Sequence, residues 1–193
     1  MTYSSSFAEG TAPTPSTGDR DYIPPAPMVE RVETTTITRE PQEVERPTSE
    51  DLSSHLVSLA SLTHQLYTQA HLIHLNVESP IFLSLHKFLK KEYERHISQF
   101  DSLAEYVRTL DYLMPMCARG LQQACKNFKH VKSYEMKEML TTYLKNLEQA
   151  IELSKDLTCT ARVSGAPDIE NYLAEYMSEC AKSAWFIKAT LRE

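Results

Sequence analysis

Apolar residues recur at intervals of three and four over four long stretches of the chain, which is the spacing of one face of an α-helix. The first stretch begins after Pro47, where Thr48-Ser-Glu-Asp51 resembles a helix capping box, and ends near Asn76, shortly before Pro80. Its apolar face comprises Leu52, Leu56, Leu59, Leu66, Ala70 and Ile73. This pattern predicts a helix over residues 48–76.

A second helix is predicted over residues 81–110. Its apolar face comprises Phe82, Leu85, Leu89, Ile97, Phe100, Leu103, Val107 and Leu110. The next segment, to about Val131, has a weaker period and fits a crossover that carries a short helix. Two further helices are predicted, one opening near Ser133 and one after Gly165 and Pro167 that reaches Leu191. Four long helices with one long middle connection predict an all-α, four-helix bundle with a crossover.

Residues 1–47 differ in composition from the rest of the chain. They hold seven of the ten prolines together with many Ser and Thr residues and few large apolar ones, so they are predicted to be disordered. The helical domain is expected to span residues 48–193. The tail carries four arginines and no lysine against eight acids, and the whole chain has a formal charge of −6. This balance favours a protein that handles cations, and little or no DNA binding is expected.

The sequence begins without the apolar core of a signal peptide, and it has no run of 18 apolar residues. Four cysteines lie far apart without a metal-binding spacing, which fits thiols in a reducing compartment, and Cys180 falls in an apolar helical stripe. We therefore expect a cytoplasmic protein with no membrane contact.

Four residues stand out as candidate metal ligands: His74, His86, Asp101 and Glu105. Imidazole and carboxylate together suit iron and other first-row divalent metals, and acids four residues apart lie on one helix face. His86 and Asp101 are 15 residues apart, or about 22 Å along one helix, so they cannot share a metal within one chain. A site with all four needs the histidines of one subunit and the acids of another. The alternative is that all four are ordinary polar surface residues.

These spacings resemble a known family. The stretch from Ala70-His-Leu-Ile-His-Leu-Asn76 through His86 to Asp101-Ser-Leu-Ala-Glu105 is similar to the signature of the Dps proteins, a group of ferritin-like proteins. In that signature a His-x-Asn sequence is followed by a second His twelve residues later and then by Asp-x-x-x-Glu. The segment Ser183-Ala-Trp-Phe also resembles the Trp-containing end of the last Dps helix. The resemblance covers roughly residues 50–193.

The resemblance implies a hollow homododecameric shell with two-fold and three-fold interfaces. It implies ferroxidase sites between two-fold related subunits, each formed by His74 and His86 of one subunit and Asp101 and Glu105 of the other. Such a protein oxidises Fe(II) with hydrogen peroxide or oxygen, stores ferric iron and protects against oxidative stress. The sequence has no Glu-x-x-His, which argues against a di-iron centre inside one bundle.

Several positions depart from the Dps pattern. Lys90 stands where Dps proteins usually carry another acid, so a cation lies one turn from His86 and would weaken a second iron position. We expect either a modified site, with one strong metal position or zinc in place of iron, or a Lys90 side chain that turns aside to pair with Glu94. A structural or metal-sequestering cage with an impaired ferroxidase site is the alternative function, and a nucleoid-binding Dps protein is a third reading that the acidic tail disfavours. His71 is a candidate extra ligand.

Two more features follow from the resemblance. Leu75 replaces the tryptophan that follows the first histidine in many relatives, and Tyr67 or Tyr93 is a candidate substitute. Acids near the start of the last helix line an iron-entry pore in the family, which suggests Asp168 and Glu175 here. Acids are also favoured at any helix N-terminus by the helix dipole, which explains such residues equally well.

Overall fold

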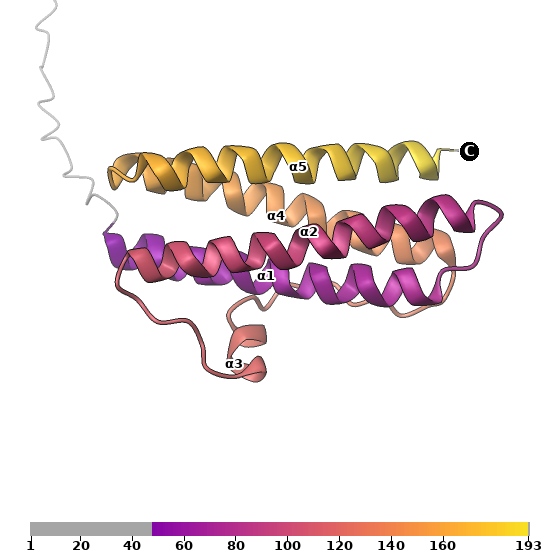
Figure 1. Ribbon diagram of the computed structural model, residues 1–193, viewed down its shortest axis with the longest axis horizontal. Helices are drawn as coiled ribbons and strands as arrows, with labels where there is room; N and C mark the ends of the chain where they lie inside the picture. Colours follow the sequence, from indigo (N-terminus) through magenta and orange to yellow (C-terminus); the bar gives the residue numbers. More distant parts are fainter. Residues whose placement is uncertain (1–47, 193) are drawn as a thin grey trace, which may run out of the picture. The chain divides into compact units, whose positions relative to one another are not determined.

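The computed structural model describes residues 48–192, so the disorder predicted for residues 1–47 concerns residues outside this range. The described part is all-α. It consists of α1 (Ser49–Asn76), α2 (Phe82–Thr109), α3 (Ala118–Gln123), α4 (Met136–Val163) and α5 (Pro167–Leu191). Helix α1 packs along α2 and α4 packs along α5, while the short α3 lies outside this bundle (Figure 1). The predicted four-helix bundle, with a short helix in its crossover, is confirmed.

The helix ends follow local side-chain hydrogen bonds. At the start of α1 the Thr48 Oγ1 atom accepts from the Asp51 N–H at 3.2 Å, and the Asp51 carboxylate accepts from the Thr48 N–H at 2.9 Å, so the predicted capping box is present. The helix predicted to open near Ser133 begins three residues later, at Met136. Ser133 Oγ accepts from the Glu135 N–H at 3.1 Å and so stabilises the turn before the helix.

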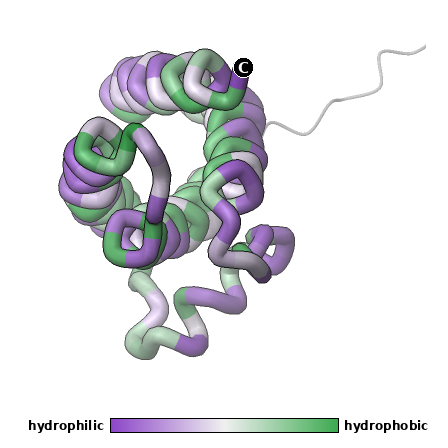
Figure 2. Tube along the Cα trace, turned by 90° about the vertical axis from the view of Figure 1, so that its right-hand side faces the viewer, coloured by the Kyte–Doolittle hydropathy of each residue, from purple (hydrophilic) through white to green (hydrophobic). Residues whose placement is uncertain are grey.

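The apolar faces of the four long helices meet inside the bundle (Figure 2). All six residues predicted for the inner face of α1 are buried. Helix α2 differs from the prediction because Phe82 and Ile97 are 43% and 49% exposed. The inward positions between Leu89 and Leu103 are taken by Glu92, His96 and Gln99. Cys180 is fully buried, as predicted. None of the helices in residues 48–192 is long and apolar enough to cross a membrane.

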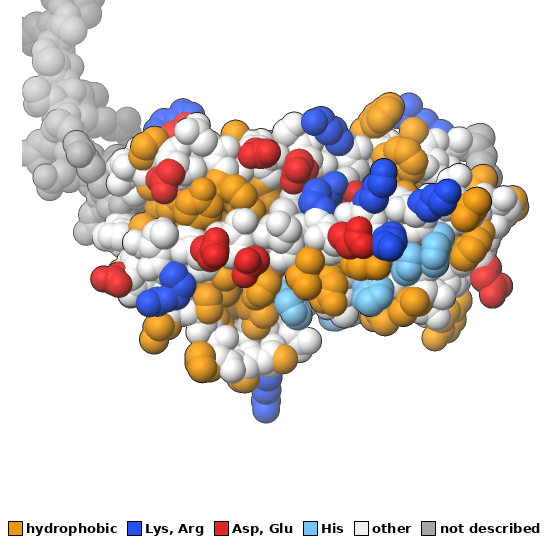
Figure 3. All heavy atoms as spheres, in the orientation of Figure 1, with side chains coloured by type: hydrophobic (Ala, Val, Ile, Leu, Met, Phe, Trp, Pro, Cys, Tyr) orange, Lys and Arg blue, Asp and Glu red, His pale blue; other side chains and the backbone are white. Residues whose placement is uncertain are grey.

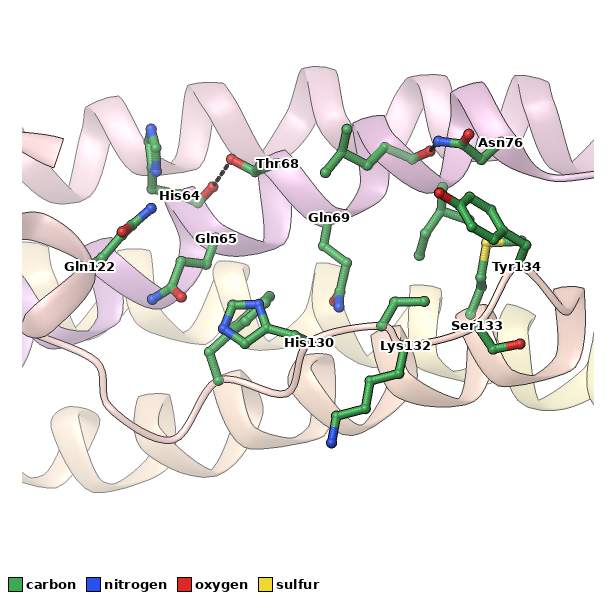
Figure 4. A pocket seen from close by; sticks show the side chains of 15 residues that line it. His64, Gln65, Thr68, Gln69, Asn76, Gln122, His130, Lys132, Ser133 and Tyr134 are labelled. Atoms are coloured by element: carbon green, nitrogen blue, oxygen red, sulfur yellow. Dashed lines mark hydrogen bonds between the residues drawn. The ribbon is translucent and has the colours of Figure 1, made fainter. Parts of the chain in front are cut away.

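The crossover between α2 and α4 is held by a row of polar side chains on α1. Three of them, spaced four residues apart on α1, donate to backbone carbonyl oxygens that are also four residues apart: Ser61 to Leu121, Gln65 to Cys125 and Gln69 to Lys129. Figure 4 shows Gln65 and Gln69 directed from α1 toward the crossover. These bonds satisfy the backbone of a segment that is largely irregular, and so fix its path along α1.

Candidate metal centre

His74 and His86 meet at the end of the α1–α2 hairpin. His74 lies in the last turn of α1 and is 7% exposed, and His86 lies near the start of α2. Their rings stack with 3.7 Å between centroids and 20° between planes. The expectation that the antiparallel hairpin brings these two residues together is confirmed.

Reciprocal hydrogen bonds fix both imidazoles. His74 Nδ1 lies 2.8 Å from the carbonyl oxygen of His86, and His86 Nδ1 lies 3.0 Å from the carbonyl oxygen of His74. Because a carbonyl oxygen only accepts, each Nδ1 must carry the hydrogen. In the neutral form, each Nε2 then keeps a lone pair that can bind a metal. The backbone of the hairpin thus fixes the orientation of both rings and leaves each Nε2 without a backbone partner.

Further aromatic residues surround the histidine pair. The Tyr93 ring lies 5.4 Å from the His74 ring and 4.4 Å from the His71 ring, measured between centroids. His71 is 6.1 Å from His74, and Tyr67 is 6.4 Å from Tyr93. Histidine side chains gather on this face of the α1–α2 hairpin (Figure 3). Of the two tyrosines considered as substitutes for the missing tryptophan, Tyr93 is therefore the nearer to the histidine pair.

The acid pair lies elsewhere on α2. Asp101 and Glu105 are both exposed, one helical turn apart, in the half of α2 distant from His86. Within residues 48–192 no three His, Cys, Asp or Glu side chains come close enough together to hold a metal ion. Within one subunit the histidine pair and the acid pair therefore lie at two separate places.

Lys90 pairs with a neighbouring acid on α2. Its ammonium lies 3.8 Å from the Glu94 carboxylate, one turn along α2, and both side chains are more than half exposed. This pairing was predicted as the alternative to a modified metal site. An exposed pair of this kind is weak, so the ammonium remains free to move toward His86 or toward other charges.

The two pore candidates lie in the first half of α5. Asp168 and Glu175 are both exposed and are seven residues, or two helical turns, apart. Glu170 lies between them in sequence and instead pairs with Arg162 at 2.6 Å. Asp168 and Glu175 thus remain available at the surface of the subunit for contacts with solvent or with another subunit.

A cavity of about 430 Å³ lies between α1 and the last part of the crossover (Figure 4). Its wall includes His64, Gln65, Asn76, His130, Lys132 and Tyr134. No acidic residue lines it. Without a carboxylate, its side chains have no negative charge to balance a divalent iron ion, so this cavity is not a second candidate for the iron site.

Sequence reasoning missed a group of polar residues inside the bundle. Glu92, His96 and Gln99 are 3%, 0% and 5% exposed, and Arg95 lies beside them. Burial, together with the charge of Arg95, lowers the pKa of His96 to about 3, so this imidazole is neutral near pH 7. Their spacing could have identified them as buried, because positions 89, 92, 96, 99 and 103 follow the inward-facing period of α2 without a break.

Residues 53–193 match the family described as "Ferritin-like domain". None of the curated proteins that were searched matches the chain. Solved structures give many matches. A Dps protein from Vibrio cholerae O1, described as a member of a superfamily of ferritin-like diiron-carboxylate proteins, is 21% identical with a TM-score of 0.70, over 75% of this chain and 91% of that one.

Two further Dps structures are equally similar in shape. The archaeal homologue from Halobacterium salinarum is 25% identical with a TM-score of 0.71, over 75% of this chain and 81% of that one. Dps from Staphylococcus aureus is 18% identical with a TM-score of 0.72, over 76% of this chain and 99% of that one. The chain thus has the fold of these proteins over nearly their whole length.

Proposed function

Because the chain belongs to the ferritin-like domain family, we propose that it is a Dps-type protein that binds and oxidises Fe(II) and stores ferric iron. The site is formed by His74 and His86 of one subunit and by Asp101 and Glu105 of its two-fold related neighbour. A two-fold interface repeats each contact, so every subunit pair holds two such sites.

The orientation of the histidine pair carries this proposal. Both Nδ1 atoms are engaged by backbone carbonyls, which leaves two Nε2 lone pairs at the same end of the hairpin. Two neutral imidazoles alone carry no charge to balance a divalent cation. Carboxylates are therefore required, and the exposed Asp101 and Glu105 supply two of them from the neighbouring subunit.

Each residue has a distinct part in the reaction. The imidazoles hold Fe(II) in a fixed position, and the carboxylates stabilise Fe(III) more than Fe(II) because its charge is greater. Hydrogen peroxide or oxygen takes the electrons that the iron loses. The product then enters the interior of a dodecameric shell, and exposed acids such as Asp168 and Glu175 line the three-fold pore by which iron arrives.

Lys90 supports a second candidate function. It lies one turn from His86, where its positive charge would repel a second metal ion. With one metal position per site, the protein would bind iron or zinc as a sequestering cage and oxidise iron slowly. The pairing with Glu94 weakens this repulsion without removing it. Iron oxidation therefore remains the first of the two candidate functions.

Stopped-flow Fe(II) oxidation by the His74→Ala/His86→Ala double variant tests the proposal. We expect loss of the fast phase with an intact assembly by gel filtration. His55→Ala is the matched control, because His55 is an exposed histidine near the other end of α1. A double variant that oxidises iron as fast as this control would disprove the proposed site.

A further inference from the structure

The cavity between α1 and the last part of the crossover takes no part in the proposed iron site. Its volume of about 430 Å³ lies within the range of about 300–1,000 Å³ that is usual for small-molecule sites. Figure 4 shows His64 and Gln122 at one end of it and Asn76 and Tyr134 at the other. The cavity thus runs along the second half of α1 and is large enough for a small organic molecule.

The crossover wall of the cavity is held in place from two sides. The Lys129 N–H donates to Asn146 Oδ1 at 2.9 Å, and the Lys129 carbonyl oxygen accepts from Asn146 Nδ2 at 2.8 Å and from Gln69 Nε2 at 2.9 Å. Asn146 is a fully buried residue of α4, and its Nδ2 also donates to Gln69 Oε1 at 2.9 Å. The backbone that leads into the cavity wall is therefore fixed between α1 and α4. A ligand would find a largely preformed site, which lowers the cost of binding.

The deeper part of the cavity is apolar and partly aromatic. Ile73 and Met139 line it and are each only 2% exposed. Phe128, which also lines it, is half-buried, and its ring lies 5.3 Å from the His130 ring at an angle of 67°. Tyr134 is 80% exposed at one end. Aromatic side chains favour ring ligands, because rings contact each other well both edge to face and in offset stacks.

The charge around the cavity is positive. Its walls come from two stretches, residues 52–77 and 112–134, that contain no Asp or Glu, although the whole chain has 26 such residues. The second stretch carries four cations, Arg119, Lys126, Lys129 and Lys132. Lys132 lines the cavity, is exposed, and forms no ion pair with any residue between 48 and 192. A surface with cations and no acids attracts anions.

We propose that this cavity binds a small organic anion with an aromatic body, such as an aromatic carboxylate or sulfonate. The rings of the ligand pack on the apolar wall formed by Ile73, Phe128 and Met139, and its acidic group pairs with the Lys132 ammonium. The long, exposed side chain of Lys132 can adjust to the position of that group. This binding is independent of the iron site proposed above.

Other classes of ligand fit the cavity less well. An inorganic anion would pair with Lys132 but would gain nothing from the apolar wall, and a neutral aromatic molecule would gain nothing from the charge. A cation would be repelled, because no lining residue is acidic. Burial lowers the pKa of His64, so this lining residue is neutral near pH 7 and Lys132 remains the main charge.

Fluorescence titration of the full-length protein with two probes tests this inference. Anilinonaphthalene sulfonate and phenylnaphthylamine share their rings and differ in the sulfonate. Thr68→Trp fills the cavity from α1, and Lys132→Glu reverses its charge. The matched controls are Ser54→Trp, at another exposed position of α1, and Lys182→Glu, at an exposed position of α5, and neither residue lines the cavity. Both cavity changes are at exposed positions, so the helices should be retained, which circular dichroism checks.

We expect saturable binding of the sulfonate at about one molecule per subunit, and binding of the neutral probe that is about tenfold weaker. Thr68→Trp should abolish this binding and Lys132→Glu should weaken it about tenfold or more, while both controls bind as wild type does. The inference is wrong if the sulfonate does not bind saturably, as when a neighbouring subunit fills the cavity. It is also wrong if the two probes bind equally, or if either cavity variant binds as tightly as its control.

Discussion

His74 and His86 each donate their Nδ1 hydrogen to the backbone carbonyl of the other, across the turn between α1 and α2, while their rings stack at 3.7 Å. The pair therefore fastens the hairpin before any metal binds. A neutral hydrogen bond contributes about 1 kcal/mol. The same contacts that orient the ligands also stabilise the fold.

His86→Ala should lower the free energy of unfolding by about 1–2 kcal/mol in metal-free protein, because it removes one hydrogen bond and the ring contact with His74. Urea unfolding followed by circular dichroism measures this. The control is Lys87→Ala at the next, exposed position. Equal losses for the two variants would show that the pair has no structural role.

Lys90→Asp should strengthen metal binding at the proposed ferroxidase site. Replacing a positive by a negative charge one turn from His86 is worth on the order of 1–2 kcal/mol toward a divalent ion, or about tenfold in affinity. Fe(II) oxidation should become faster and the number of iron ions bound per subunit should rise. Lys91→Asp, exposed on a different side of α2, is the control and should change neither quantity.

The fold was largely predictable because apolar residues at helical spacing mark the buried face of a helix such as α1. The six apolar residues predicted for its inner face could be found by spacing alone, although Ser61, Gln65 and Gln69 are also buried on this helix. The short helix in the crossover followed from the weaker apolar period of that segment, and both hairpins followed from turn residues such as Pro80 and Gly165. Helix α4 was predicted to open near Ser133 and begins three residues later, at Met136.

The interior of α2 could not be predicted in the same way. Ile97 was taken as core because it is apolar, whereas the inward turn is formed by Glu92, His96 and Gln99. Their partners come from residues 47 to 91 positions away, including Tyr143 and Ser183. A single sequence gives no information about such distant partners. The histidine pair was predictable because its partners are local.

His96 should make the protein sensitive to acid. Its pKa is about 3 in the folded state and near 6.5 when unfolded, so the unfolded chain binds the extra proton between these values. Stability is therefore lost as the pH falls from 6.5, by up to about 1.4 kcal/mol per pH unit. In urea unfolding between pH 7 and 5, His96→Gln should lose less stability than wild type.

His130→Gln is the control for this pH series, since His130 is exposed. It should follow the wild-type pH dependence. If the free energy of unfolding changes equally with pH in His96→Gln and His130→Gln between pH 7 and 5, then His96 does not titrate as its burial requires.

The cysteines should differ in reactivity. Burial raises the pKa of the Cys180 thiol to about 12, so only about one molecule in ten thousand carries the reactive thiolate at pH 8. Cys159 is exposed. In native protein treated with iodoacetamide, mass spectrometry should find Cys159 labelled and Cys180 labelled only after unfolding. Comparable labelling of both in native protein would contradict this packing.

Mixed assemblies test the shared metal site most directly. His74→Ala/His86→Ala subunits and Asp101→Asn/Glu105→Gln subunits should each assemble without fast Fe(II) oxidation. When equal amounts are unfolded and reassembled together, half of the two-fold contacts join unlike subunits, and each of these restores one of its two sites. The proposal predicts about one quarter of the wild-type oxidation rate, whereas a site within one subunit predicts no recovery at all.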